Sequence, residues 1–249
     1  LYISCACVIE EGFPMDTLEE IVKSMAETAA KVGVQIVSGD TKVAGKGQVD
    51  GIFITTTGVG EIMPKAELSG AYARSEDAIL VTGDVGRHGC TILLERDRYG
   101  MEAEVTSDCA PLWHPVRDLI QEIPEVHVIR DATRGGVGTV LYEIADESKV
   151  GIRLDAESVP VCDEVRGVTG MLGLEPLYLA CEGRLVIFVP KEKAEDAVRI
   201  LREASPDTAG AAIIGEVTDH MTGHVVMATE LGTETLLPPP SGELLPRIC

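Results

Sequence analysis

The chain has 249 residues, with 21 basic and 41 acidic side chains and a formal net charge of −20 at pH 7. A negative charge of this size repels nucleic-acid phosphates and anionic lipid headgroups, so binding to nucleic acid or to a membrane surface is not expected. Although 45% of the residues are hydrophobic, no apolar run approaches the length that crosses a bilayer, roughly 20 residues. These properties predict a globular, cytoplasmic protein.

The seven cysteines are scattered along the chain and form no Cys-x-x-Cys pair. An odd number of scattered cysteines fits a reducing cytoplasm better than a disulfide framework. The sequence opens at Leu1 without a charged segment followed by a long apolar one, which argues against a signal peptide. Because no Met stands first, we expect the sequence to begin inside a longer protein.

The first predicted element is a helix from residue 14 to Gly33, with Asp16 as its N-cap and apolar side chains at helical spacing. Residues 34–37 are predicted to form a strand that leads into a loop at 38–42, and a threonine-rich strand is predicted at 51–59. The loop would then lie at the carboxyl end of a strand, where α/β proteins place their ligands.

Periodicity is lost between residues 61 and 76, which indicates a link between two domains. Alternating elements follow, with predicted strands at 78–82, 126–129, 151–154, 185–189, 211–217 and 224–229, and predicted helices from 90, at 111–122, after 136, at 163–171 and at 191–204. We therefore predict an α/β fold with α+β layers. Residues 1–65 are assigned to a first domain, 66–234 to a second, and 235–249 to a flexible C-terminal arm.

The arm is predicted from three consecutive prolines at 238–240, because such a run forms neither a helix nor an interior strand. Cys249 is its last residue. Termini are rarely packed, and a mobile thiol is prone to oxidation, so burial is a poor explanation for a cysteine at this position. The pattern favours an attachment point, and composition alone does not identify the attached group.

The predicted loop at 38–42 contains Gly39, Asp40, Thr41 and Lys42. Glycine allows backbone amides to approach phosphate, a carboxylate binds Mg²⁺, and lysine pairs with anionic oxygen. An ordinary Gly-Asp turn with a solvated lysine explains the same residues. Taken alone, the ordinary turn is the preferred interpretation.

A second turn has the same design, with Asp131, Thr133, Gly135 and Gly136 between a predicted strand and a helix. A helix N-terminus binds anions through its free N–H groups and its dipole. The alternative is a capped turn in which Asp131 or Thr133 is the cap. Because two such turns occur in one chain, two interpretations are equally supported: a metal–phosphate site, and a pair of ordinary turns.

Two single residues are further candidates. Glu182 precedes the apolar strand at 185–189 and could accept a proton in a pocket, although an exposed turn acid is the more common case. His88 lies in a glycine-rich stretch and is the one histidine predicted to face a ligand. The other four histidines have no ligand spacing and are predicted to be structural or surface residues.

Five segments carry a resemblance to a known family, namely residues 10–14, 24–29, 39–43, 130–137 and the ending Pro246-Arg247-Ile248-Cys249. Together they resemble the HypE family of hydrogenase maturation factors nearly end to end, and the ending is the most specific match. HypE belongs to the ATP-binding superfamily of aminoimidazole ribonucleotide (AIR) synthetase and selenophosphate synthetase. The resemblance implies a two-domain PurM/AIR synthetase-like fold with an N-terminally truncated first domain, and a homodimer.

The resemblance also implies an activity, the ATP-dependent dehydration of a carbamoyl group on Cys249 to a thiocyanate. A carbamoyltransferase, HypF, loads the group, and the cyano group passes to iron on a HypC–HypD complex in [NiFe]-hydrogenase maturation. Asp40 and Asp131 match the Mg²⁺–phosphate acids, Lys42 a lysine near the thiocarbamate, and Glu182 the acid that takes the amide protons. The remaining nucleotide-binding positions are Gly39, Thr41, Thr133, Gly135 and Gly136.

Two departures from the family pattern affect these expectations. Cys181 and Arg184 flank Glu182-Gly183 where the family usually has Asn and Lys, and a further N-terminal segment with more Mg²⁺-binding acids is missing. We therefore expect this chain to bind ATP poorly. The alternatives are a non-catalytic cysteine carrier or metal chaperone, and a small-substrate ATP-dependent kinase of the same superfamily; neither explains a stiff arm that ends in cysteine as well.

Overall fold

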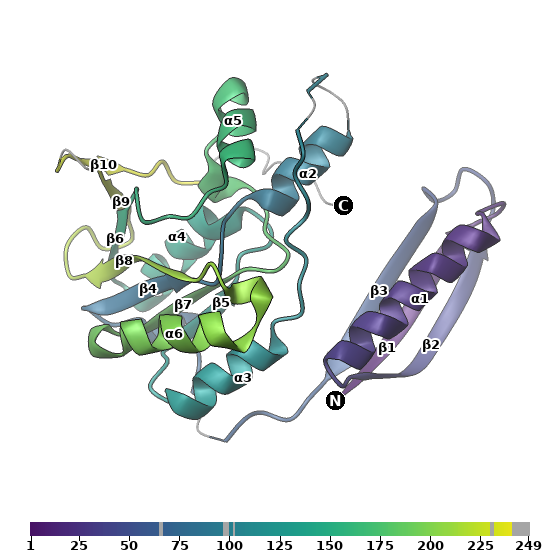
Figure 1. Cartoon of the computed structure of the whole chain (residues 1–249), viewed down its shortest axis with the longest axis horizontal. Helices are drawn as coiled ribbons and strands as arrows, with labels where there is room; N and C mark the ends of the chain where they lie inside the picture. The colour runs from purple at the N-terminus through teal and green to yellow at the C-terminus, as the bar shows by residue number, and fades with distance from the viewer. Residues whose placement is uncertain (65–66, 97–99, 102, 230–231, 241–249) are drawn as a thin grey trace. The chain divides into compact units, whose positions relative to one another are not determined.

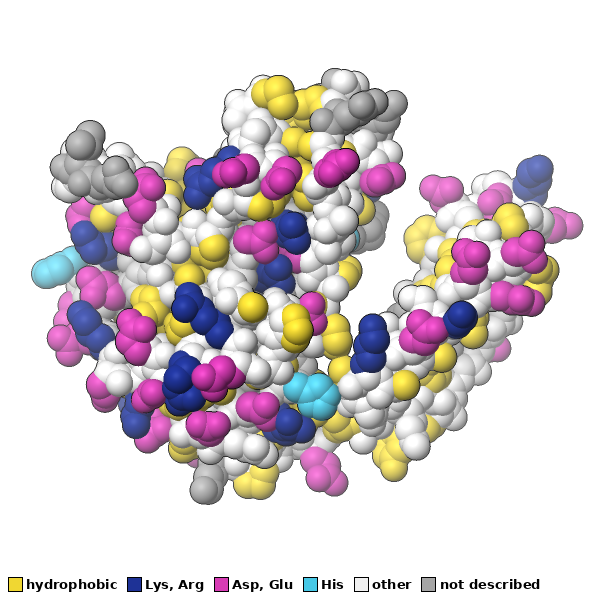
Figure 2. All heavy atoms as spheres, in the orientation of Figure 1, with side chains coloured by type: hydrophobic (Ala, Val, Ile, Leu, Met, Phe, Trp, Pro, Cys, Tyr) yellow, Lys and Arg dark blue, Asp and Glu magenta, His cyan; other side chains and the backbone are white. Residues whose placement is uncertain are grey.

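The computed structural model describes residues 1–249 except 65–66, 97–99, 102, 230–231 and 241–249 (Figure 1). The chain forms two compact units, Leu1–Pro64 and Lys65–Cys249. Among the described residues, no helix combines the length and the apolar character that a membrane span requires. Figure 2 shows acidic side chains spread over the visible faces of both units, with lysines and arginines interspersed among them.

The first unit is a three-stranded sheet with one long helix. Strands β1 (Tyr2–Glu10), β2 (Gln35–Ala44) and β3 (Ile52–Val59) lie in the order β2-β1-β3, with β1 parallel to β2 and antiparallel to β3. Helix α1 (Met15–Lys31) connects the parallel strands and lies along one face of the sheet (Figure 1). A crossover helix is the usual connection between parallel strands, because a tight turn cannot join them.

Two predictions in this unit are wrong in detail. Asp16 lies in the first turn of α1, and Pro14 is the N-cap. The predicted loop at 38–42 belongs to β2, because the strand pairs with β1 through Ala44. Glycine at position 39 serves this pairing, since a Cβ there would lie 2.6 Å from the carbonyl oxygen of Cys5.

The second unit contains a seven-stranded sheet in the order β10-β9-β6-β8-β4-β7-β5. Its strands are β4 (Asp77–Val81), β5 (Val128–Asp131), β6 (Gly151–Asp155), β7 (Leu185–Pro190), β8 (Ala212–Thr218), β9 (Val225–Ala228) and β10 (Glu234–Leu236). Its α-helices are α2 (Arg87–Glu95), α3 (Trp113–Glu122), α4 (Gly136–Ser148), α5 (Asp163–Leu172) and α6 (Ala194–Ala204). Short 3₁₀ turns lie at Gly70–Tyr72 (η1), Pro176–Tyr178 (η2), Lys191–Lys193 (η3) and Pro206–Thr208 (η4).

The centre of this sheet is covered on both faces. Alternate residues of β4 and β7 pack on opposite sides: Ile79 and Phe188 join the core beneath α4, whereas Leu80 and Ile187 join the core beneath α3 and α6. Strands that are buried on both faces have continuous apolar sequences, as the predicted strands here do. Each fully buried side chain of this size contributes about 1.5–3 kcal/mol to folding. The predicted α/β fold with mixed layers is confirmed.

The C-terminal arm differs from its prediction over its first residues. Instead of leaving the fold at residue 235, the chain pairs with β9 as β10, and Leu237 is buried. The hydroxyl of Tyr142 donates to the carbonyl of Leu237, and that of Tyr178 donates to the carbonyl of Pro238. Burial raises the pKa of Tyr178 to about 12, which keeps its hydroxyl a donor. Cys249 lies outside the described residues.

Candidate functional site

The candidate site lies at one edge of the seven-stranded sheet. Because β7 is antiparallel to both of its neighbours, the carboxyl ends of β4 and β5 meet its amino end there. The loops are joined by hydrogen bonds, since the N–H of Leu185 donates to the Thr82 hydroxyl at 3.0 Å and that of Ala132 donates to the Arg184 carbonyl at 3.1 Å. This edge therefore brings Asp131, which ends β5, toward the loop that contains Glu182.

The segment from 176 to 182 is fixed between the first turns of α2 and α4. The N–H of Gly89 donates to the carbonyl of Ala180 at 2.9 Å, and the N–H of Cys181 donates to the carbonyl of Ala132 at 3.0 Å. A Cβ at Gly136 would lie 2.4 Å from the carbonyl oxygens of Leu177 and Leu179. The segment that leads into Glu182 is thus held from both sides by backbone contacts.

The turn after β5 combines an exposed polar end with a buried glycine pair. The hydroxyl of Thr133 donates to Oδ2 of Asp131 at 2.7 Å. Gly135 and Gly136 are buried and have left-handed φ angles of 79° and 62°. The close approach that glycine permits at 136 is to the protein's own backbone, so packing alone explains this residue. Of the predicted site residues in this turn, Asp131 is exposed and Thr133 is partly exposed.

Electrostatics distinguish Glu182 from an ordinary surface acid. Partial burial raises the pKa of Glu182, His88 opposes this effect, and the negative charges of Asp108 and Asp131 add to it. A carboxylate with a raised pKa holds a proton more tightly, which makes it a better proton acceptor near neutral pH. Glu182 is therefore suited to general-base chemistry.

Sequence reasoning missed Ser107 and Asp108, which connect His88 to Glu182. Oδ1 of Asp108 accepts the N–H of Glu182 at 2.7 Å, and Oγ of Ser107 lies 2.9 Å from Nδ1 of His88. Asp108 is only 5% exposed. Both residues lie in a stretch without helix or strand, so no periodic signal marks them.

The two departures from the family pattern have structural roles. Arg184 donates to the carbonyl of Asp84 at 2.9 Å and to its carboxylate at 2.8 Å, and this carboxylate also pairs with Arg87 at 3.0 Å. Cys181 is buried and accepts the N–H of Gly86 at 3.2 Å; burial raises the pKa of its thiol to about 12. Arg184 therefore braces the loop after β4, and Cys181 stays a neutral thiol.

The predicted residues of the first unit lie on one exposed strand. Successive side chains of β2 point to opposite faces, so Asp40 and Lys42 share one face, and Gly39 and Thr41 share the other. Oδ1 of Asp40 accepts the N–H of Thr41 at 2.9 Å. The structure brings Asp40 and Lys42 together in this unit, and it brings Asp131, Thr133 and Glu182 to one edge of the second.

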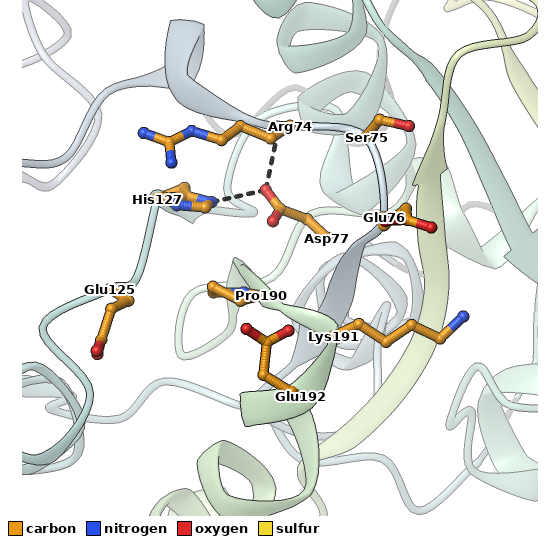
Figure 3. A pocket seen from close by; sticks show the side chains of 9 residues that line it. All are labelled: Arg74, Ser75, Glu76, Asp77, Glu125, His127, Pro190, Lys191 and Glu192. Atoms are coloured by element: carbon orange, nitrogen blue, oxygen red, sulfur yellow. Dashed lines mark hydrogen bonds and ion pairs between the residues drawn. The ribbon is translucent and has the colours of Figure 1, made fainter.

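A pocket of about 610 Å³ lies at the opposite edge of the same strands and contains none of the predicted site residues. Figure 3 shows Asp77 between Arg74 and His127 at its inner side. Oδ2 of Asp77 accepts the N–H of Arg74 and lies 2.8 Å from Nδ1 of His127. The buried acid of this edge is satisfied by its neighbours.

Comparison with known proteins gives consistent matches to both units. The family model "AIR synthase related protein, N-terminal domain" matches residues 1–62, and the corresponding C-terminal domain model matches residues 74–227. The carbamoyl dehydratase HypE of Azotobacter vinelandii is 45% identical over 248 residues, which cover 100% of this chain and 72% of that protein.

Two solved structures have the same fold at similar identity. The hydrogenase maturation protein HypE in complex with ATP is 46% identical with a TM-score of 0.92, and the match covers 100% of this chain and 75% of that chain. HypE in a HypE–HypF complex is 40% identical, also with a TM-score of 0.92, and the match covers 96% of this chain and 78% of that chain.

Proposed function

This chain belongs to the AIR synthase-related proteins and, among them, to the HypE family of carbamoyl dehydratases, and we propose that it dehydrates a carbamoyl group carried on its own Cys249. ATP is the second substrate and a thiocyanate is the product. The observation that carries the proposal is Glu182, a half-buried carboxylate with a raised pKa beside Asp108 and Asp131. Removal of protons from an amide nitrogen requires such an acceptor.

The proposed reaction exchanges a poor leaving group for a good one. The carbamoyl oxygen attacks the γ-phosphorus of ATP; an O–P bond forms, ADP leaves, and the nitrogen loses its first proton. The second proton then leaves, its electron pair completes the C≡N bond, and the C–O bond breaks to release phosphate. Positioning and charge neutralisation supply most of the catalysis in phosphoryl transfer.

Each predicted residue has a role in this reaction. Glu182 accepts an amide proton, and Lys42 neutralises charge that develops on the reacting oxygens. Nucleotide-binding roles are proposed for Gly39, Asp40 and Thr41 of the first unit and for Asp131 and Thr133 of the second, while Gly135 and Gly136 contribute by shaping the turn after β5.

Magnesium is proposed as the metal because its preferred ligands are present. Asp40 and Asp131 are exposed carboxylates, and Mg²⁺ takes oxygen ligands, often one or two carboxylates together with substrate phosphates. In the part of the chain that the structure describes, no three His, Cys, Asp or Glu side chains are grouped to hold a metal ion. The proposed site therefore depends on phosphate oxygens as further ligands. When bound, Mg²⁺ would neutralise phosphate charge.

The partners follow from the same family. A relative of this chain has been solved in a HypE–HypF complex, and we propose HypF as the donor that carbamoylates Cys249. A HypC–HypD complex is the proposed acceptor of the cyano group, with a homodimer as the working form and the cytoplasm as the location.

Intact-protein mass spectrometry tests this function. The protein should gain one carbamoyl group from a HypF donor system and then lose one water when Mg²⁺ and ATP are added, with ATP at a concentration that saturates even a weak site. Cys249→Ser should abolish the dehydrated product, while Cys109→Ser, which alters an exposed cysteine of the second unit, should not. If wild type is carbamoylated but then loses no water, the proposed dehydration is wrong and the protein acts as a cysteine carrier.

A further inference from the structure

The start of the C-terminal arm is bonded to the second unit by two tyrosine hydroxyls. Tyr142 of α4 donates to the carbonyl of Leu237, and Tyr178 of η2 donates to the carbonyl of Pro238. The N–H of Leu237 donates to the carbonyl of Val225 at 2.9 Å, and its side chain, only 2% exposed, belongs to the core beneath α4. The two residues that follow β10 are therefore fixed by the fold.

The ring of Tyr178 is itself held in place. It packs against α4, where a Cβ added at Gly138 would lie 2.5 Å from Cε1 of the ring. Its neighbours Leu177 and Leu179 are buried, and their carbonyl oxygens lie so close to Gly136 that a Cβ there would be 2.4 Å from each. The Tyr178 hydroxyl is therefore directed at a fixed position.

The segment that contains Tyr178 also leads to the proposed proton acceptor. Glu182 follows Tyr178 by four residues, in the stretch that is fixed between the first turns of α2 and α4. Because an extended chain advances at most about 3.6 Å per residue, the backbone between these two residues spans at most about 14 Å. The arm therefore starts from the same rigid support that holds Glu182.

The part of the chain beyond Pro238 has enough length to reach Glu182. Residues 239–249, which we call the tether, are eleven residues and extend over at most about 40 Å. This reach exceeds the backbone span from Tyr178 to Glu182 by much more than the length of a tyrosine side chain and its hydrogen bond. Delivery of a group on Cys249 therefore does not require either hydroxyl bond to open.

We propose that Tyr142 and Tyr178 are positioning residues that fix the start of the arm during dehydration, so that only the tether moves the carbamoyl group to Glu182. This inference rests on the proposed function and adds two residues to it. Neither tyrosine needs to touch the reacting atoms. Both hydroxyls remain donors, because burial raises the pKa of Tyr142 and raises that of Tyr178 to about 12.

The advantage of the fixed start is a short tether. Without it, the chain would be free from the end of β9 at Ala228, and the length that carries Cys249 would grow from 11 to 21 residues. The effective concentration of a tethered group falls roughly with the −3/2 power of tether length, so this change would lower it about threefold. The carbamoyl group would then meet Glu182 less often.

Hydrogen exchange tests whether the hydroxyls hold the arm. The variant Tyr142→Phe/Tyr178→Phe keeps both rings and removes both donors, and Tyr72→Phe is the matched control because that tyrosine is exposed. We expect the Leu237 amide to exchange at least about tenfold faster in the double variant, since two hydrogen bonds that fix this residue and the next are lost. Equal exchange in the double variant and the control would overturn the proposal.

Single-turnover dehydration tests whether the fixed start matters for the reaction. With the carbamoyl group on Cys249, the double variant should react about threefold more slowly than Tyr72→Phe. A ten-residue Gly-Ser insertion after Pro240 in otherwise wild-type protein lengthens the tether to the same 21 residues and should slow the reaction by the same factor. An unchanged rate in a double variant with faster exchange at Leu237 would overturn the positioning role.

A free substrate separates positioning from structure. In a Cys249→Ser background, a peptide of residues 244–249 with a carbamoylated cysteine should be dehydrated equally fast with and without the two Tyr→Phe substitutions, because no tether is involved. An equal loss of rate on the peptide and on tethered Cys249 would show that the tyrosines only stabilise the fold. If wild type dehydrates neither substrate, the proposed function fails, whereas the exchange of Leu237 still shows whether the hydroxyls hold the arm.

Discussion

The two edges of the seven-stranded sheet each contain a buried aspartate and a histidine bonded through Nδ1, and they differ in what remains unpaired. At the pocket edge, Asp77 binds both the His127 ring and the backbone N–H of Arg74. At the other edge, Asp108 and His88 each retain a buried polar atom without a partner among the described residues. A satisfied pair stabilises a fold, whereas unsatisfied atoms indicate a place where something else binds or moves.

Cavity volume alone would point to the pocket edge, whereas the proposed site lies at the other edge. The pocket beside Asp77 has a volume of about 610 Å³, yet none of the predicted site residues lines it. Glu182, at the opposite edge, has a raised pKa for identifiable physical reasons. The raised pKa of Glu182 together with the unpaired buried atoms is the reason for proposing the site at that edge.

The largest expected effect comes from Glu182→Gln, which keeps the side-chain size and removes the proton acceptor. We expect dehydration to slow by roughly 100- to 10,000-fold, the range for loss of a general base, with carbamoyl loading unchanged. Glu192→Gln alters an exposed acid of the pocket edge and is the matched control. Similar rates in the two variants would remove the distinction between the edges.

The pH dependence sharpens the comparison further. Because burial and neighbouring acids raise the pKa of Glu182, the dehydration rate should rise with pH through an inflection above the ordinary glutamate value of 4.5. Asp108→Asn removes one neighbouring charge and retains an acceptor for the Glu182 N–H, so the inflection should move to lower pH. An inflection that stays in place in the pH–rate profile of this variant would show that Asp108 does not act on Glu182.

Substitutions at the pocket edge should lower the stability of the fold and leave the dehydration rate unchanged. Asp77→Asn weakens two buried hydrogen bonds and should lower the free energy of unfolding by about 1–3 kcal/mol in urea titration. The exposed Glu76→Gln should change it by less than about 0.5 kcal/mol. Dehydration by folded Asp77→Asn should match wild type, and a slowed reaction there would mean that this edge also takes part.

Much of the fold around the proposed site could be predicted from the sequence, because the strongest sequence patterns come from residues that are close together in the chain. The strand–acid–glycine–helix pattern located Asp131 at the end of β5, and the apolar run after Glu182 located β7. The errors concern features that depend on contacts between distant parts of the chain. Gly39 and Asp40 have the composition of a turn, yet pairing with β1 extends the strand through them.

Asp108 illustrates what local sequence cannot predict. Its burial comes from packing against residues more than 70 positions away, where a Cβ on Gly183 would lie 1.9 Å from its carbonyl oxygen. The sequence around Asp108 has no hydrophobic periodicity from which that contact could be predicted. The start of the arm was misjudged for a similar reason, since β10 depends on pairing with β9.

The most direct test of the account follows the carbamoyl oxygen. Protein carbamoylated at Cys249 with a heavy oxygen isotope is mixed with ATP and Mg²⁺, and the released phosphate and water are analysed by mass spectrometry. Phosphorylation of the amide oxygen predicts that the label appears in phosphate, in equal amount to the thiocyanate formed, and that Glu182→Gln releases almost none. Label in water, with unlabelled phosphate, would contradict the proposed dehydration.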